Sequence, residues 1–222
     1  MTWIQGGPLL EVSFLIYCDS TREEFLLDVI NKITKLECFV NFANLEINMD
    51  IEKFVDGYEY DFENSIIIHS IEIDFIAQIG RTRKGTIYIS EIYFETYVVD
   101  LCFFGSAFDA VEWNQVGIKK DEYIYFIGLL KELYEIFDFR VGGIALEDDI
   151  KVLYASEQPW PNIDYQIVNL KCTELDKKLS EFVALIWNEK IEQLDTEVKA
   201  MHVHQKIKND GIMFTNDWQE TF

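Results

Sequence analysis

Histidines are the first candidates for chemistry, because imidazole binds metals and exchanges protons near neutral pH. His202 and His204 form a close pair. A metal site needs three or four converging ligands, and no cysteine lies near this pair in the sequence, so we interpret both as solvated residues at a helix end. His69 stands among isoleucines. We interpret it as a satisfied core histidine, since a catalytic base needs a neighbouring nucleophile or carboxylate.

The acidic run Glu147-Asp148-Asp149 is a second candidate, because it follows a short expected strand. Acids in this position often hold Mg²⁺ in α/β enzymes, although helix capping or solvation explains them equally well. Gly142-Gly143 lacks the spacing and the Lys-Ser/Thr of a phosphate loop, and no GxSxG motif is present. We therefore expect no enzyme, no catalytic residue, no metal ligand and no cofactor. A divalent-metal enzyme that uses the acidic run is the weaker alternative.

Acids alternate with aromatic residues between positions 46 and 63, where Lys53 is the single base. Acids attract a basic partner over a distance, and aromatic side chains give contact area at low entropic cost. Two interpretations stay open: a surface that captures a basic protein, or a solvated hairpin whose aromatics pack inward. On the first, the partner-binding residues are Asp50, Glu52, Asp56, Tyr58, Glu59, Tyr60, Asp61, Phe62 and Glu63.

The chain is strongly acidic, with 40 Asp and Glu against 19 Lys and Arg and a net charge of −21. Such a chain repels nucleic acids, whose binding depends on basic groups, and it repels anionic membranes for the same reason. A basic protein partner is favoured instead, because complementary charge accelerates association. The acids of segment 46–63 could also imitate nucleic-acid phosphates in the cationic groove of a nuclease.

Targeting and cysteine signals indicate a cytoplasmic protein. The first residues, MTWIQGGPLLEV, contain no basic region followed by an apolar run, so we expect no secretory signal. No apolar stretch approaches the ~20 residues that span a bilayer. The four cysteines are scattered without metal-like spacing, and we expect free thiols in a reducing compartment.

Hydrophobic periodicity indicates an α+β fold. We expect a half-buried strand at 10–16, a capping box at Ser20-Thr21-Arg22-Glu23 that opens a helix, a basic turn at 80–85, and antiparallel strands with one wet face. The other expected strands are 42–52, 67–77, 86–103 and 139–146. A second helix begins at Asp121, a loop occupies 158–162, and a third helix runs from Thr173 to Leu194.

These elements predict a single α+β domain over residues 1–222, with an antiparallel sheet packed against about three amphipathic helices. We expect the last dozen residues to be frayed. Residues 208–222 then form a loosely docked tail, in which Met213, Phe214, Trp218 and Phe222 are the candidates for docking. The sequence leaves the oligomeric state open.

The central stretch reads FFGSAFDAVEWNQVGIKKDEYIYFIGLLKELYEIFDFRVGGIALEDD and is followed by a WPN loop. Over roughly residues 100 to 165 it resembles the small acidic immunity proteins of bacterial polymorphic toxin systems, in particular the class catalogued as immunity protein family 64. The resemblance rests on the order of a strand, an FG turn, a Trp-bearing segment, an amphipathic helix and a glycine-bearing strand. It supplies no site residues. It implies a cytosolic antidote that binds and blocks a cognate toxin, often a nuclease. The alternative is an acidic DNA mimic that inhibits a nuclease which is not its cognate.

Overall fold

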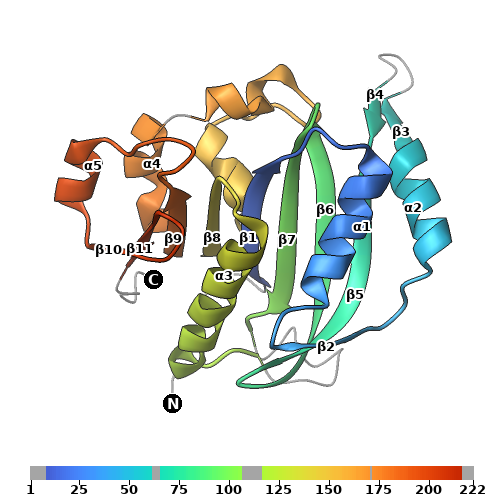
Figure 1. Ribbon diagram of the computed structural model, residues 1–222, viewed down its shortest axis with the longest axis horizontal. Coiled ribbons are helices and arrows are strands. Elements are labelled where there is room, and N and C mark those ends of the chain that lie inside the picture. The colour runs from blue at the N-terminus through green and yellow to red at the C-terminus, as the bar shows by residue number, and fades with distance from the viewer. Residues whose placement is uncertain (1–8, 62–65, 107–116, 171, 217–222) are drawn as a thin grey trace.

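The computed structural model describes residues 9–61, 66–106, 117–170 and 172–216 (Figure 1). The described helices are α1 (Arg22–Ile33), α2 (Ile47–Asp56), α3 (Tyr123–Phe137), α4 (Cys172–Lys178) and α5 (Thr196–Met201). The described strands are β1 (Leu9–Tyr17), β2 (Phe39–Phe42), β3 (Tyr58–Asp61), β4 (Ile66–Ile68), β5 (Ser70–Ile79), β6 (Arg81–Tyr93), β7 (Thr96–Phe104), β8 (Val141–Leu146), β9 (Phe182–Asn188), β10 (His204–Lys206) and β11 (Gly211–Thr215).

Nine of these strands form one sheet, in the order β10-β11-β9-β8-β1-β7-β6-β5-β2. Every pairing in it is antiparallel. The predicted α+β class is thus confirmed, although the described residues hold five helices rather than about three. Strands β3 and β4 form a separate two-stranded hairpin beside α2, at the right of the view in Figure 1.

Helix α1 opens with a capping box one residue later than predicted. The Thr21 hydroxyl accepts a hydrogen bond from the backbone N–H of Glu24 at 3.2 Å, and the Glu24 carboxylate accepts one from the N–H of Thr21 at 3.1 Å. Two otherwise unpaired amides are satisfied in this way. The helix buries Phe25, Leu26 and Val29 against the sheet, as its apolar spacing predicts.

The centre of the sheet is buried on both faces. On one face, Leu10, Val12 and Phe14 of β1 join the core under α1 and α3, which lie in front of the sheet in Figure 1. On the other face, Leu15 joins a second core made with α4, α5 and short 3-10 turns. Ser13 on that face is 1% exposed. The prediction of one wet face is therefore wrong for β1, and β5 retains the predicted alternation.

The third predicted helix is wrong beyond Lys178. Helix α4 ends there, and Phe182–Asn188 forms β9 inside the sheet, with all seven residues buried. A strand covered on both faces has a continuous apolar sequence rather than an alternating one. Such a continuous apolar run also fits the spacing of an amphipathic helix. Pairing with β8 and β11 makes this segment a strand.

The predicted strand at 42–52 is also wrong, because Ile47–Asp56 is helix α2. Apolar residues alternate up to Ile51, but Ile47, Ile51 and Phe54 also fit one helical face. Phe54 is fully buried in the core under α1. Gly57 follows at φ +69°, a left-handed conformation that glycine adopts freely and that ends the helix.

The predicted hairpin is present with a tighter turn. Gly80 at φ +67° makes the turn between β5 and β6, so Arg81, Arg83 and Lys84 lie in a strand rather than in a turn. The predicted single strand at 86–103 is wrong, because a turn after Tyr93 divides it into β6 and β7. Strand β11 pairs with β9 and buries Met213 and Phe214, which docks this part of the predicted tail. Trp218 and Phe222 lie outside the described residues. In the described part of the chain, no helix is both long and apolar enough to cross a bilayer.

Candidate functional site

Helix α2 exposes three large apolar side chains to solvent. Phe54 is buried, whereas Ile47, Met49 and Val55 are exposed. Exposed Glu52 and Asp56 lie on the same short helix. An amphipathic helix normally hides its large apolar side chains. The exposed apolar and acidic side chains of α2 together are therefore a candidate contact surface.

Asp50 is the exception among the predicted binding residues on α2, because it is only 9% exposed. Its Oδ2 atom accepts a hydrogen bond from the backbone N–H of Glu46 at 2.9 Å, and its Oδ1 lies 3.3 Å from Lys53 Nζ. The carboxylate thus satisfies an amide at the start of the helix. Asp50 therefore stabilises the start of α2 and exposes little surface, and its role as a partner contact stays a prediction.

The hairpin after α2 exposes its aromatic residues. Tyr58 is 51% exposed and Tyr60 63% exposed, and Glu59 between them is exposed as well. His69 Nδ1 lies 3.1 Å from the carbonyl oxygen of Phe54, so the base of the hairpin is tied to the end of α2. Of the two interpretations of this segment, inward packing holds for Phe54 and solvent exposure holds for the two tyrosines.

We define the acidic–aromatic surface as the exposed acidic, aromatic and aliphatic side chains of α2 and β3; α2 also exposes Asn48 and Lys53. Its members are Ile47, Met49, Glu52, Val55, Asp56, Tyr58, Glu59 and Tyr60. Five of them were predicted as binding residues. The three aliphatic members were not predicted, because Ile47 and Met49 fall in the stretch 42–52 that was predicted as a strand and Val55 lies beyond it. Asp61 is placed by its backbone pairing with Ile66, and Phe62 and Glu63 lie outside the described residues.

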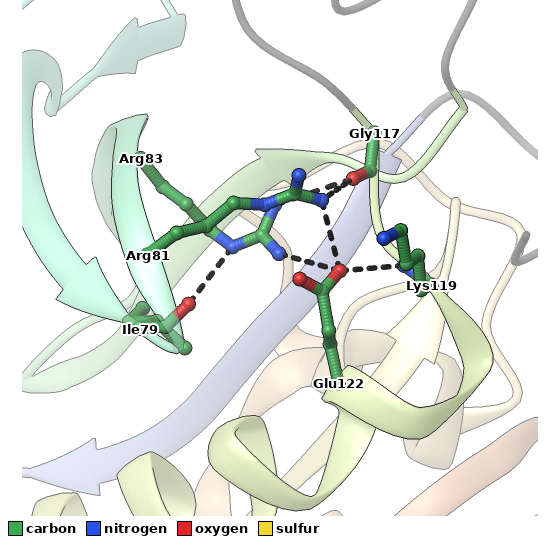
Figure 2. A network of polar contacts seen from close by, with 6 residues as sticks. All are labelled: Ile79, Arg81, Arg83, Gly117, Lys119 and Glu122. Carbon is green, nitrogen blue, oxygen red and sulfur yellow. Dashed lines mark hydrogen bonds and ion pairs between the residues drawn. The ribbon is translucent and has the colours of Figure 1, made fainter.

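Two basic residues of β6 form ion pairs within the fold. They are distant in sequence from the acidic–aromatic surface. Arg81 and Arg83 both reach Glu122 at the start of α3, with each Nη2 atom 2.9 Å from Glu122 Oε2 (Figure 2). The same oxygen accepts a hydrogen bond from the N–H of Lys119 at 2.7 Å. Arg83 is 2% exposed, and burial lowers its pKa. These cations therefore serve the fold rather than a basic patch.

The other candidates occupy structural positions. His202 Nε2 lies 2.7 Å from Asp176 Oδ1, and His204 is exposed. Asp149 caps a 3-10 turn by accepting a hydrogen bond from the N–H of Lys151 at 2.7 Å. The acidic run 147–149 does not itself gather as a ligand group. Among the described residues, the side chains that do converge are Glu11, Asp100 and Cys102.

Comparisons with known proteins add little to this geometry. No family model matches the chain, and no curated protein matches it, so immunity protein family 64 receives no support. A solved chain from the complex of the toxic C-terminal tip of CdiA from Pseudomonas aeruginosa with its immune protein is 15% identical, with a TM-score of 0.36. The likeness covers 69% of this chain and 92% of that chain. At this score it establishes neither a shared fold nor a shared function.

Proposed function

We propose that this protein is an immunity protein that binds and neutralises a basic bacterial toxin domain through its acidic–aromatic surface. The observation that carries the proposal is the exposure, on the two elements α2 and β3, of Tyr58 and Tyr60 together with Glu52, Asp56 and Glu59. The resemblance of the central stretch to immunity proteins supplies the class of partner. The proposal includes a nuclease as the toxin activity, because a nuclease carries a cationic groove that such acids complement.

Charge supports this mode of binding. The net charge of −21 gives a long-range attraction for a cationic partner, and the acids of α2 and β3 place part of it beside the contact residues. Electrostatic steering of this kind raises association rates by about 10- to 1,000-fold and weakens as salt is added. The surface is therefore suited to rapid capture of a toxin domain.

The tyrosines supply the anchoring contacts. Tyrosine is enriched at interface hot spots, since its ring buries a large area and its hydroxyl retains a polar partner. Removing such an anchor acts mainly on dissociation, whereas removing peripheral charge acts mainly on association. The contribution of the tyrosines can thus be measured from the dissociation rate, and that of the acids from the association rate.

The direct test is co-expression with a candidate toxin domain, which is sought among the genes that neighbour this one. Survival of the host together with a purified complex supports the proposal, and continued killing with no complex formed excludes it. Capture of a nuclease encoded elsewhere, without protection against the neighbouring toxin, would instead support the DNA-mimic alternative.

The surface is tested by matched triple variants. Glu52→Ala/Asp56→Ala/Glu59→Ala and Glu157→Ala/Glu197→Ala/Asp210→Ala each change the net charge from −21 to −18. We expect the first to slow association by roughly tenfold and to flatten its salt dependence. The second triple lies outside the surface and should have a much smaller effect. Equal effects of the two triples would show that only net charge matters.

A further inference from the structure

Two neighbouring strands bring three potential metal ligands together on one face of the sheet. Glu11 on β1 lies directly opposite Cys102 on β7, and Ser13 lies opposite Asp100. Side chains two residues apart on a strand share a face. The carboxylates of Glu11 and Asp100 and the thiol of Cys102 accordingly converge, with all three ligand atoms within 4.8 Å of one another.

The buried carboxylate of Asp100 has fewer hydrogen-bond donors around it than its two oxygens can accept. It is 6% exposed, and its Oδ2 atom accepts a hydrogen bond from the Cys102 thiol at 3.1 Å. Its Oδ1 atom has no hydrogen-bond partner among the described residues. Buried polar atoms nearly always have a partner, because an unmet acceptor loses its hydration without compensation. The protonated Glu11 carboxyl can donate a hydrogen bond to this carboxylate, so Asp100 faces a second potential ligand.

The electrostatic surroundings add to the negative charge. Asp149 approaches both carboxylates, and Lys151, which forms an ion pair with Asp149, is the cation that offsets them. Burial raises the pKa of Glu11, of Asp100 and of the Cys102 thiol, so the empty cluster holds protons near neutral pH.

We propose that Glu11, Asp100 and Cys102 bind one Zn²⁺ ion between β1 and β7. Zinc accepts oxygen and sulfur ligands in a tetrahedral arrangement, and three protein ligands leave one position for water. Magnesium and calcium prefer a shell of six or more oxygens, which a thiol does not complete. Binding releases to solvent the thiol proton and the protons held by the two carboxyl groups, so that one thiolate and two carboxylates become the ligands. Glu11 is only partly buried, so one ligand of the cluster contacts solvent.

The site is independent of the proposed toxin binding. The expectation that the chain holds no metal ligand came from sequence spacing, which does not reveal that positions 11 and 100 share a strand pair. An ion here would join two central strands and neutralise buried acid, so it should stabilise the folded state by mass action.

Zinc chloride added to chelator-treated, reduced protein tests the site. We expect one zinc per chain in competition with a chromophoric chelator, and a higher melting temperature. Each of Asp100→Asn, Cys102→Ser and Glu11→Gln should weaken binding by at least about 10- to 100-fold, the range seen when only outer-shell partners are lost. Magnesium chloride at the same concentration should leave the melting temperature unchanged. Absence of zinc binding, or equal stabilisation by magnesium, would overturn the proposal.

Cobalt substitution identifies the sulfur ligand without relying on variant stability. The Co²⁺-loaded wild-type protein should show thiolate-to-cobalt charge-transfer absorption. The band should persist in Cys38→Ser and in His202→Ala/His204→Ala, which remove other potential ligands, and should be lost in Cys102→Ser. A wild-type complex without the band, or a band abolished by the histidine double variant, would refute the assignment.

Discussion

Glu122 at the start of α3 holds two arginines of β6, and replacing it with glutamine should strongly destabilise the fold. Its Oε2 atom lies 2.9 Å from the Nη2 atoms of both Arg81 and Arg83 (Figure 2). Glutamine keeps the shape and an acceptor for the N–H of Lys119, and it removes only the charge. The variant therefore isolates the value of the ion pairs.

The magnitude follows from burial. The Arg83 side chain is 2% exposed and that of Glu122 is 15% exposed, whereas that of Arg81 is 31% exposed. Removing one partner of a buried pair costs about 3–5 kcal/mol, because the other charge stays buried without compensation. The more exposed Arg81 contact adds at most about 1 kcal/mol. Since Glu122 retains some solvent contact, we expect a loss of about 3 kcal/mol in the free energy of unfolding.

Urea denaturation followed by tryptophan fluorescence measures this loss. For a domain of this size, about 3 kcal/mol corresponds to a fall in Tm of about 6–12 °C. Glu135→Gln on the same helix is the matched control, since Glu135 pairs with Lys208 at 2.9 Å and both side chains are exposed. The control should lose less than about 1 kcal/mol. A Glu122→Gln variant no less stable than Glu135→Gln would refute the reasoning.

Three smaller changes test local features by the same denaturation assay. Thr21→Ala removes the α1 cap and should cost about 1 kcal/mol, and Ser20→Ala should cost less; the reverse order would place the cap as the sequence suggested. Gly143→Ala brings a Cβ to 2.4 Å from the Cδ1 of buried Phe182 and should cost about 1–3 kcal/mol. Gly128→Ala in α3 meets nothing within 4 Å and should gain about 0.5–1 kcal/mol, so a loss there would reveal a contact on that face.

Elements with a local pattern could be predicted from the order of residues alone. Alternation identified β1 and much of β5, a 3.6-residue period identified α1 and α3, and acid–aromatic alternation located the surface now assigned to α2 and β3. These signals are readable because one face of each element meets the core and imposes a period on nearby residues. The acidic charge, which favours a basic partner, is likewise a property of composition alone.

Features that depend on contacts between distant residues emerged only in the folded chain. Strand β9 is apolar throughout because it is covered on both faces, and this removed the alternation that would have identified it. Phe54 entered the core while Tyr58 and Tyr60 stayed in solvent, because Gly57 ends α2 between them. Glu11, Asp100 and Cys102 meet because the register of β1 against β7 places them side by side. Strand register is fixed by the packing of the whole sheet, so no spacing along the chain could have revealed that cluster.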